Sequence, residues 1–276
     1  MKQIFVANKK SKIENIRKKY PSAEILDITS TSPFSGARVL SPFYPHGNIP
    51  IPGMPEKKAA CVEAVWQGLK VFEDYGVDFD TFRNDTMTDI KRTVRKFGRP
   101  LGHQYGKELL DYRDARWKIY LPSYLYVLQN VPSVVNTLVK IKAQLEKSDI
   151  VFLDYNTNCN IADYSKPLSH AGLVKLYLEG KYPRIEDREK FESENKTIVT
   201  YDTVNELVVA IQSHPKFTQK KYGKYIEEIK LTDEIDIQAV SELGKGKRDG
   251  WKTIIKDIQK PSFFKMQSVV QTTIQF

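Results

Sequence analysis

The chain has 276 residues and carries 43 Lys and Arg against 34 Asp and Glu, a formal net charge of +9. Because 41% of the residues are hydrophobic and 11% are aromatic, the sequence can fill a core, which excludes wholesale disorder. It contains no run of about 18 apolar residues, no apolar stretch typical of a signal peptide, and only two cysteines, so we expect a cytoplasmic protein without membrane spans or a disulfide framework.

The first 30 residues predict a strand, a helix and a second strand. Residues 3–7 are short and apolar, and residues 24–29 alternate as a half-buried strand does. Between them, Ile13 and Ile16 share one face of a helix over 13–20. The chain therefore starts with alternating strand and helix.

The stretch 41–55 holds five prolines and two glycines in 15 residues. This density is expected to exclude regular structure, because each proline fixes φ and removes a hydrogen-bond donor. The resulting stiff loop carries Phe43, Tyr44, His46 and Asn48. We interpret it either as a binding wall or as a plain extended connector.

A helix is expected over 56–75, where an apolar stripe repeats at helical spacing. The stripe consists of Val62, Val65, Trp66, Leu69 and Phe72. Glu63, Gln67 and Lys70 follow at i, i+4 and i+7, so they project as one polar row beside the stripe. A partly desolvated Glu acts as a general acid or base, and a partly desolvated Lys can form a Schiff base with an opened sugar. The alternative is a solvated helix flank with ordinary charge pairs.

Further helices are expected over 86–97, 109–120, 123–130, 133–147 and 168–179, with a break at Pro122. Residues 149–153 are β-branched or aromatic and predict a buried strand. The polar segment that follows this strand begins at Asp154 and continues to Asn160. Binding sites often lie at the carboxyl end of such a strand, whereas the alternative is a simple Asx-rich turn.

The stretch 88–118 contains nine basic and four acidic side chains, and Tyr105, Tyr112 and Trp117 lie among them. Nucleotide sites usually combine arginines, which bind the phosphate, with aromatic rings, on which the base stacks. The candidates for this role are Arg99, Arg113, Arg116 and, in the same stretch, His103. The alternative is a basic face exposed to solvent.

Residues 184–196 hold nine charged side chains out of 13 and mark a domain boundary. After it we expect strands over 197–201, 225–231 and 264–274, and helices over 203–211, 235–243 and 251–258. Residues 197–276 are therefore interpreted as a small α+β accessory module. The charge excess lies before the boundary, since 190–276 carries 14 basic and 12 acidic residues.

The sequence has no Gly-rich dinucleotide motif, no P-loop and no metalloprotease motif, and its four histidines lack metal-ligand spacing. We therefore expect neither a metal nor a cofactor. Two segments nevertheless resemble a known pattern: Leu-Ser-Pro-Phe-Tyr-Pro at 40–45, and Cys-Val-Glu-Ala-Val-Trp-Gln-Gly-Leu-Lys at 61–70. They resemble the NADAR/YbiA-like superfamily of N-glycosidases, with its L-S-N-F-Y-P loop and its helix S-x-E-H-x-[YFW]-Q-x-x-K. Pro42 and Ala64 depart from the family's Asn and His.

The resemblance implies an α+β fold, with a helix-rich NADAR/YbiA-like domain over 1–183. It implies that Glu63 and Lys70 are catalytic. The family's later D-x-x-W-G motif has no good match in this sequence, and Asp154 or Asp163 is the candidate for its Asp. Phe43, Tyr44, Trp66 and Gln67 would contact the substrate.

The implied reaction is hydrolysis of an N-glycosidic bond in a ribosyl-phosphate compound, such as ADP-ribose on guanine in nucleic acid. Two alternatives stay open. One is a DNA- or RNA-binding protein without catalysis, such as a phage host-takeover factor. The other is a sensor that retains a pocket for ADP-ribose or NAD but has lost catalysis.

Overall fold

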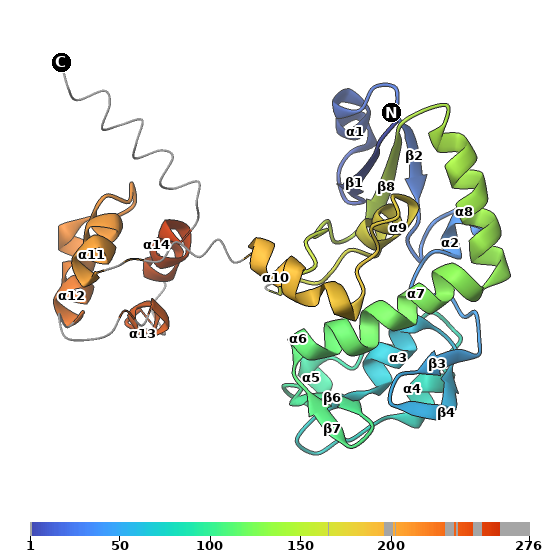
Figure 1. The fold of residues 1–276 in the computed structure, drawn as a ribbon, viewed down its shortest axis with the longest axis horizontal. Helices are drawn as coiled ribbons and strands as arrows, with labels where there is room; N and C mark the ends of the chain where they lie inside the picture. The colour runs from blue at the N-terminus through green and yellow to red at the C-terminus, as the bar shows by residue number, and fades with distance from the viewer. Residues whose placement is uncertain are drawn as a thin grey trace. The chain divides into compact units, whose positions relative to one another are not determined.

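The computed structural model describes residues 2–164, 166–195, 201, 203–229, 235, 237–244 and 250–259. The chain divides into two compact units, Met1–Phe191 and Glu192–Phe276, which are considered separately below (Figure 1). Several small sheets and many helices make up the fold, so the predicted α+β class is confirmed. No helix among the described residues has the length and apolar character needed to cross a membrane.

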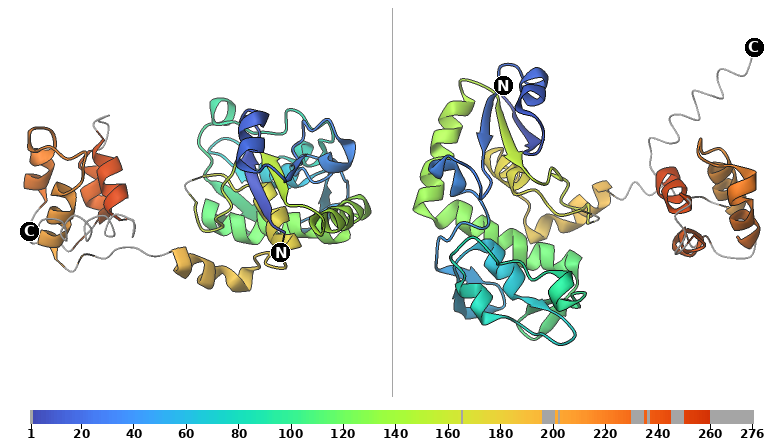
Figure 2. Two further views of the ribbon diagram at one scale, coloured as in Figure 1. Left: turned by 90° about the horizontal axis from the view of Figure 1, so that it is seen from above. Right: turned by 180° about the vertical axis from the view of Figure 1, so that it is seen from behind.

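A three-stranded parallel sheet forms one part of the first unit, with the order β1-β8-β2 (Figures 1 and 2). Its strands are β1 (Ile4–Asn8), β2 (Glu24–Asp27) and β8 (Ile150–Asp154). The central strand β8 is buried along its whole length, as expected for the apolar run Ile-Val-Phe-Leu. Because all three strands run in parallel, their carboxyl ends meet at one edge of the sheet.

Two helices cover the faces of this sheet. Helix α1 (Ile13–Lys19) packs Ile16 against Val151 and Leu153 of β8 on one face. The other face carries Ile150 and Phe152, which belong to the main core together with residues of α9 (His170–Leu178). The alternation of side chains along β8 thus divides its contacts between the two cores.

The proline-rich stretch forms a hairpin, so the expectation that it excludes regular structure is wrong. Strands β3 (Ile49–Ile51) and β4 (Met54–Ala59) pair antiparallel, with an irregular register between Pro50 and Ile51. A two-stranded sheet has only edge strands, where a missing N–H costs little. Gly53 supplies the positive φ of the turn, at 79°.

The helix expected over 56–75 is much shorter. Helix α3 (Val62–Gly68) starts after β4, with the Cys61 Sγ accepting the Ala64 N–H at 3.2 Å, and ends before β5 (Lys70–Val71). Gly68 lets the ring of Phe82, in α4 (Phe79–Arg83), approach the helix end; a Cβ there would lie 2.3 Å from that ring. After α3 the chain does not continue as a helix, because β5 pairs with β6 (Gly102–Tyr105).

The helices expected over 86–97 and 109–120 are also shorter in the structure than predicted. Only α5 (Val94–Phe97) forms in the first, since Met87 and Asp89 have positive φ. The second begins as strand β7 (Glu108–Leu110), which pairs with β6. In the second region, tertiary strand pairing thus outweighs helical periodicity.

Pro122 does not break the chain of helices. Helix α6 (Tyr112–Ala115) runs into the π-helical segment η1 (Arg116–Tyr120) and on into α7 (Leu121–Asn130). Pro122 stands in the first turn of α7, and the wider π turn before it accommodates the missing N–H. Beyond α7, α8 (Pro132–Leu145) agrees with the predicted helix over 133–147, and the short α2 (Ser35–Arg38) was not anticipated.

The charged segment 184–196 is helical, as η2 (Ile185–Asp187) and α10 (Arg188–Asn195). Its first part belongs to the first unit: an Arg188 guanidinium N lies 2.7 Å from an Asp114 carboxylate O, and the Phe191 ring lies 6.0 Å from that of Trp117. The first unit therefore extends beyond residue 183.

The second unit is helical in the residues that are described. Its helices are α11 (Val204–Gln212), α12 (Gln219–Glu228), α13 (Ile237–Glu242) and α14 (Trp251–Ile258). The strand expected over 225–231 is wrong up to residue 228, because Tyr222 and Tyr225 of α12 pack on Trp251 at helical spacing. The strands expected over 264–274 and, apart from Tyr201, over 197–201 lie outside the described residues.

Candidate functional site

A cavity of about 450 Å³ lies in the first unit. Its lining comes from α3 and β5, from the segments after β2 and β8, and from the loop between α2 and β3. The segment before α5, the stretch from α6 through η1 and the start of α9 complete it. These segments are far apart in the sequence. The cavity therefore exists only once the parallel sheet and the helical core have packed together.

The polar row of α3 and β5 forms a continuous chain of hydrogen bonds along the cavity. Gln67 Nε2 donates to Glu63 Oε1 at 2.7 Å, and Lys70 Nζ donates to Gln67 Oε1 at 2.9 Å. The backbone N–H of Arg92 also donates to Gln67 Oε1, at 3.1 Å. This second donor fixes the orientation of the Gln67 amide, so its NH₂ group faces the carboxyl group of Glu63.

Burial acts in opposite directions on the two ionisable groups of this row. Glu63 is 8% exposed, and burial raises the pKa of its carboxyl group, although Gln67, Lys91 and Lys70 oppose the shift. Burial lowers the pKa of the Lys70 amine, which Glu63 opposes. Both shifts favour the neutral forms, which are the forms needed for proton donation by Glu63 and for nucleophilic reaction by Lys70.

A second ionisable pair lies at the end of β8 and the start of α9. Asp154 Oδ2 lies 2.9 Å from His170 Nδ1, and it accepts the Ser169 hydroxyl at 2.7 Å and the Ala171 N–H at 3.3 Å. His170 Nε2 lies 3.0 Å from the carbonyl oxygen of Ile28. Because both ring nitrogens face acceptors, the doubly protonated imidazolium satisfies both contacts.

The charges of this pair stabilise each other. Burial disfavours the Asp154 carboxylate, but His170 and the donors of Ser169 and Ala171 hold its pKa to about 2. Burial likewise disfavours the imidazolium of His170, yet Asp154 raises the pKa of His170. The carboxylate also lies at the N-terminal end of α9, where free N–H groups favour negative charge.

The rest of the lining is mostly polar and aromatic, and Pro167 and Leu168 are among its aliphatic members. The loop between α2 and β3 contributes Pro42, whose carbonyl accepts the Glu63 N–H at 2.8 Å. It also contributes Phe43, with the Lys91 Nζ 5.5 Å from its ring centre. The remaining aromatic and small polar side chains are Thr29, Ser30, Ser41, Trp66, Tyr112, Tyr120, Tyr155 and Asn156. The site thus combines two carboxyl groups, two lysines and several rings.

Several predicted site residues do not line the cavity. Tyr44 and His46 pack on each other at 4.8 Å, and His46 Nε2 lies 2.9 Å from the Val39 carbonyl oxygen. Asn48 takes a positive φ of 54° in the turn that leads into β3. Arg99 and Arg113 are exposed outside the cavity. Of the four side chains predicted at the site from the proline-rich loop, only that of Phe43 lines the cavity.

Arg116 lines the cavity, but its two terminal nitrogens are already engaged. NH1 donates to the carbonyls of Ile161 and Asp163 at 2.7 and 2.9 Å, and NH2 donates to the Lys166 carbonyl at 2.9 Å and the Tyr112 hydroxyl at 3.0 Å. Arg116 is only 1% exposed. Its guanidinium therefore holds the loop between β8 and α9 rather than presenting a free phosphate fork.

His103 does not line the cavity, and its ring lies 3.9 Å from that of Trp66, which does. Burial lowers the pKa of His103 to about 3, so the ring is neutral. Neither ring nitrogen has a hydrogen-bond partner among the described residues. We assign His103 to the packing of Trp66 rather than to substrate binding.

Sequence reasoning missed Lys91, His170, Thr29 and Ser30 as lining residues. Thr29 and Ser30 follow the parallel strand β2. Binding sites often lie at the carboxyl ends of parallel strands, so the signal used for β8 could also have found these two residues. The only sequence signal near His170 was Ser169, a residue type that commonly starts a helix. Lys91 carried no distinguishing pattern within the basic stretch.

Metal-binding residues do not cluster in this site. Within the described ranges, no group of three or more His, Cys, Asp or Glu side chains is arranged to hold a metal ion. Asp154 and His170 bind each other, and Glu63 binds Gln67. The carboxyl groups and lysines of the site suit proton transfer, charge stabilisation and amine addition.

Two comparisons with known proteins bear on this site. No curated protein matches the chain. A family model described as a family of unknown function, DUF6939, matches residues 8–174, which include every residue that lines the cavity. Because this match covers more than half of the chain, the protein is a member of the DUF6939 family.

Proposed function

We propose that the cavity hydrolyses an N-glycosidic bond in a ribosyl-phosphate compound, with ADP-ribose attached to a nucleobase as the substrate class. The observation that carries the proposal is the pair of carboxyl groups, Glu63 and Asp154, whose pKa values are shifted in opposite directions within one cavity. Such pairs divide the roles of acid and stabilising anion in glycoside cleavage. The resemblance of 40–45 and 61–70 to the NADAR/YbiA-like motifs also supports it.

Glu63 is the proposed general acid and base. Its protonated carboxyl group donates to the leaving nitrogen as the C–N bond breaks and the bonding electron pair moves to that nitrogen. Water then adds its oxygen to the anomeric carbon, and the Glu63 carboxylate takes the proton that this water releases. One water is consumed, and the free base and the ribosyl product leave.

Asp154 and the lysines stabilise charge in this proposal. The Asp154 carboxylate, ionised at neutral pH, faces the positive charge that develops on the sugar ring. Lys91 is exposed at the cavity and provides a cation for the phosphate. Lys70 has one of two roles. It either provides a second cation for the phosphate, or its amine adds to the C1 aldehyde of the opened sugar, forming an imine and releasing water.

The test uses an oligonucleotide that carries ADP-ribose on guanine, with release of ADP-ribose followed by chromatography. Glu63→Gln is expected to lower turnover by about 10²- to 10⁴-fold, the usual contribution of a general acid or base. The amide keeps a hydrogen-bonding group next to Gln67, so the melting temperature should not fall. Glu56→Gln, at an exposed position of β4, is the matched control and should retain full turnover.

Other outcomes would contradict the proposal. Unchanged turnover in Glu63→Gln and in Lys70→Met would remove both residues from the reaction. Binding of ADP-ribose without turnover by the wild-type protein would favour the sensor. Binding of DNA or RNA that weakens steeply with salt, and that ignores both variants, would favour the non-catalytic nucleic-acid-binding protein.

A further inference from the structure

Two neighbouring residues after β8, Tyr155 and Asn156, both line the cavity and are not used in the proposed reaction. Tyr155 is 43% exposed, although the preceding residue, Asp154, is buried. Neither side chain carries a charge. This part of the lining therefore fits a neutral, planar part of a ligand better than a phosphate.

Several contacts hold Tyr155 in place despite its exposure. Its hydroxyl shares a hydrogen bond of 2.9 Å with Thr31 Oγ1, and its carbonyl oxygen accepts Asn8 Nδ2 at 3.1 Å. The Lys9 ammonium lies 5.5 Å from its ring centre. A ring that is held before binding loses little conformational entropy when a ligand stacks on it.

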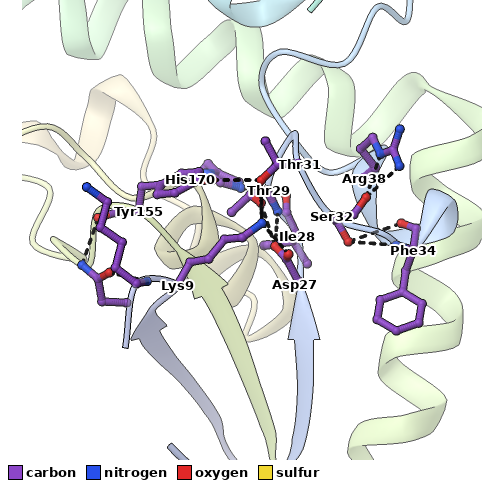
Figure 3. A network of polar contacts seen from close by, with 12 residues as sticks. Lys9, Asp27, Ile28, Thr29, Thr31, Ser32, Phe34, Arg38, Tyr155 and His170 are labelled. Carbon is purple, nitrogen blue, oxygen red and sulfur yellow. Dashed lines mark hydrogen bonds and ion pairs between the residues drawn. The ribbon is translucent and has the colours of Figure 1, made fainter. Parts of the chain in front are cut away.

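Lys9 links these contacts to the ends of the parallel strands (Figure 3). Its Nζ donates to Asp27 Oδ2 at 2.7 Å, to Thr29 Oγ1 at 2.8 Å and to Thr31 Oγ1 at 2.5 Å. These three bonds use all the donors of an ammonium group. The chain segments that follow β1, β2 and β8 are thereby joined around Tyr155.

Asn156 supplies a free amide next to this ring. Its backbone N–H donates to Asp154 Oδ1 at 3.4 Å, but its side-chain amide has no hydrogen-bond partner among the described residues. A side-chain amide offers both a donor and an acceptor, which is the pattern that recognises the edge of a nucleobase.

We propose that Tyr155 and Asn156 form the nucleobase-binding part of this site, with the Tyr155 ring stacking on the base and the Asn156 amide bonding its edge. This inference rests on the proposed function, because a base is expected only if the ligand is a nucleotide. The other exposed ring in the lining, Tyr112, suits this role less well. It is held by similar contacts, edge-on to Trp66 and with its hydroxyl accepting from Arg116, but neither of its chain neighbours lines the cavity to supply an amide beside the ring.

The experiment compares the dissociation constants of AMP and ribose 5-phosphate for the full chain by calorimetry. AMP should bind the wild-type protein about 5- to 150-fold more tightly, the range expected for one base stacked on an aromatic ring. Tyr155→Ala and Tyr155→Leu should reduce this ratio towards one and leave ribose 5-phosphate unchanged. Asn156→Ala should retain the ratio in part but lose discrimination between AMP and IMP.

Tyr75→Ala is the matched control, since Tyr75 is similarly exposed but lies outside the cavity. It should leave both constants unchanged. If the wild-type protein binds both probes equally, or if Tyr155→Ala weakens both equally, the base-binding inference is overturned while the proposed function stands. If neither probe binds, both the inference and the ribosyl-phosphate substrate are overturned.

Discussion

Glu63 in α3 and Asp154 at the end of β8 are two buried carboxyl groups of the same cavity, and they differ in their partners. Glu63 accepts a hydrogen bond from the neutral amide of Gln67. Asp154 is bonded to the imidazole of His170, to a hydroxyl and to a helix N–H. Both side chains are less than a tenth exposed, so loss of water alone does not distinguish them.

The number and charge of the direct partners account for the opposite directions of the two pKa shifts. The single amide bond from Gln67, with the charges of Lys91 and Lys70, does not offset the desolvation of Glu63, so its pKa is raised. The imidazolium and the converging donors overcome the desolvation of Asp154, so its pKa falls to about 2. The row on α3 is also local in sequence, whereas the Asp154–His170 pair depends on the loop that joins β8 to α9.

The largest expected effect tests that dependence on the loop. Arg116→Met should lower the free energy of unfolding by about 3 kcal/mol, because three carbonyl groups of the loop lose their donor at about 1 kcal/mol each. Urea unfolding measures the change. Arg113→Met, on the exposed side of α6, is the control and should change stability little.

NMR titration of His170 in Arg116→Met would sharpen the result. Displacement of the loop should move the pKa of His170 back towards its ordinary value and leave the Glu63–Gln67 contact intact. An Arg116→Met protein as stable as wild type would mean that the loop needs no such support, and Arg116 would again be a candidate for phosphate.

The second prediction compares how the two carboxyl groups affect the free energy of unfolding as the pH changes. The pKa of Asp154 is about 2 in the folded protein and 3.8 in the reference state, so Asp154 stabilises the fold above about pH 4 and loses this effect as the pH falls towards 2. Asp154→Asn should therefore lower the free energy of unfolding at pH 6 by about 2 kcal/mol. The raised pKa of His170 adds a contribution that is complete below pH 6.5 and fades as the pH rises through that pKa.

Glu63→Gln should act with the opposite sign. Because the folded pKa of Glu63 is raised, its ionisation destabilises the fold as the pH rises, and the amide removes this penalty. Urea unfolding between pH 3 and pH 9 measures both variants. Curves that shift in the same direction would show that the partner charges do not separate the two groups.

A smaller effect is expected at the strand ends. Lys9→Met removes the cation that Asp27, Thr29 and Thr31 share, and should lower the free energy of unfolding by about 1 kcal/mol near neutral pH. Burial opposes ionisation of Asp27, but its bonds to Lys9 and Thr29 lower its pKa, so the loss should shrink as the pH falls through that lowered pKa.

Lys10→Met is the matched control for Lys9→Met, because Lys10 is exposed and adjacent. Thermal unfolding at pH 7 and pH 3 measures both variants. Equal effects of the two substitutions would show that the bonds of Lys9 contribute nothing beyond the loss of a charge.

The smallest effect concerns the exposed arginines predicted as phosphate ligands. Arg99→Ala and Arg113→Ala should each change the free energy of unfolding by less than about 0.5 kcal/mol and leave turnover unchanged, since neither side chain reaches the cavity. A large loss of turnover in either variant would extend the substrate beyond the cavity over this basic surface.

Sequence periodicity predicted the elements whose partners are close by or whose apolar pattern is strong. The buried strand β8 and the helices α1, α8 and α14 agree with the predicted segments within about two residues. The same reasoning placed Glu63, Gln67 and Lys70 in one row, and they lie in contact because they are separated by only three or four positions.

Periodicity was wrong where distant strand partners compete with helix formation. Residues 108–110 form a strand because β6 pairs with them, and residues 49–59 form a hairpin despite their prolines. The length of α3 is limited by the pairing of β5 with β6 and by the approach of Phe82. None of these partners is visible in the local apolar pattern.

The sequence by itself determined the mixed fold class, the buried strand and the row of Glu63, Gln67 and Lys70. Only the tertiary structure decided which other groups reach the cavity, since Arg116 bonds carbonyls 45 to 50 positions away and His170 bonds Ile28 across 142 positions. The physical reason is that the use of a polar side chain depends on its hydrogen-bond partners. Where those partners lie far along the chain, folding alone brings them together.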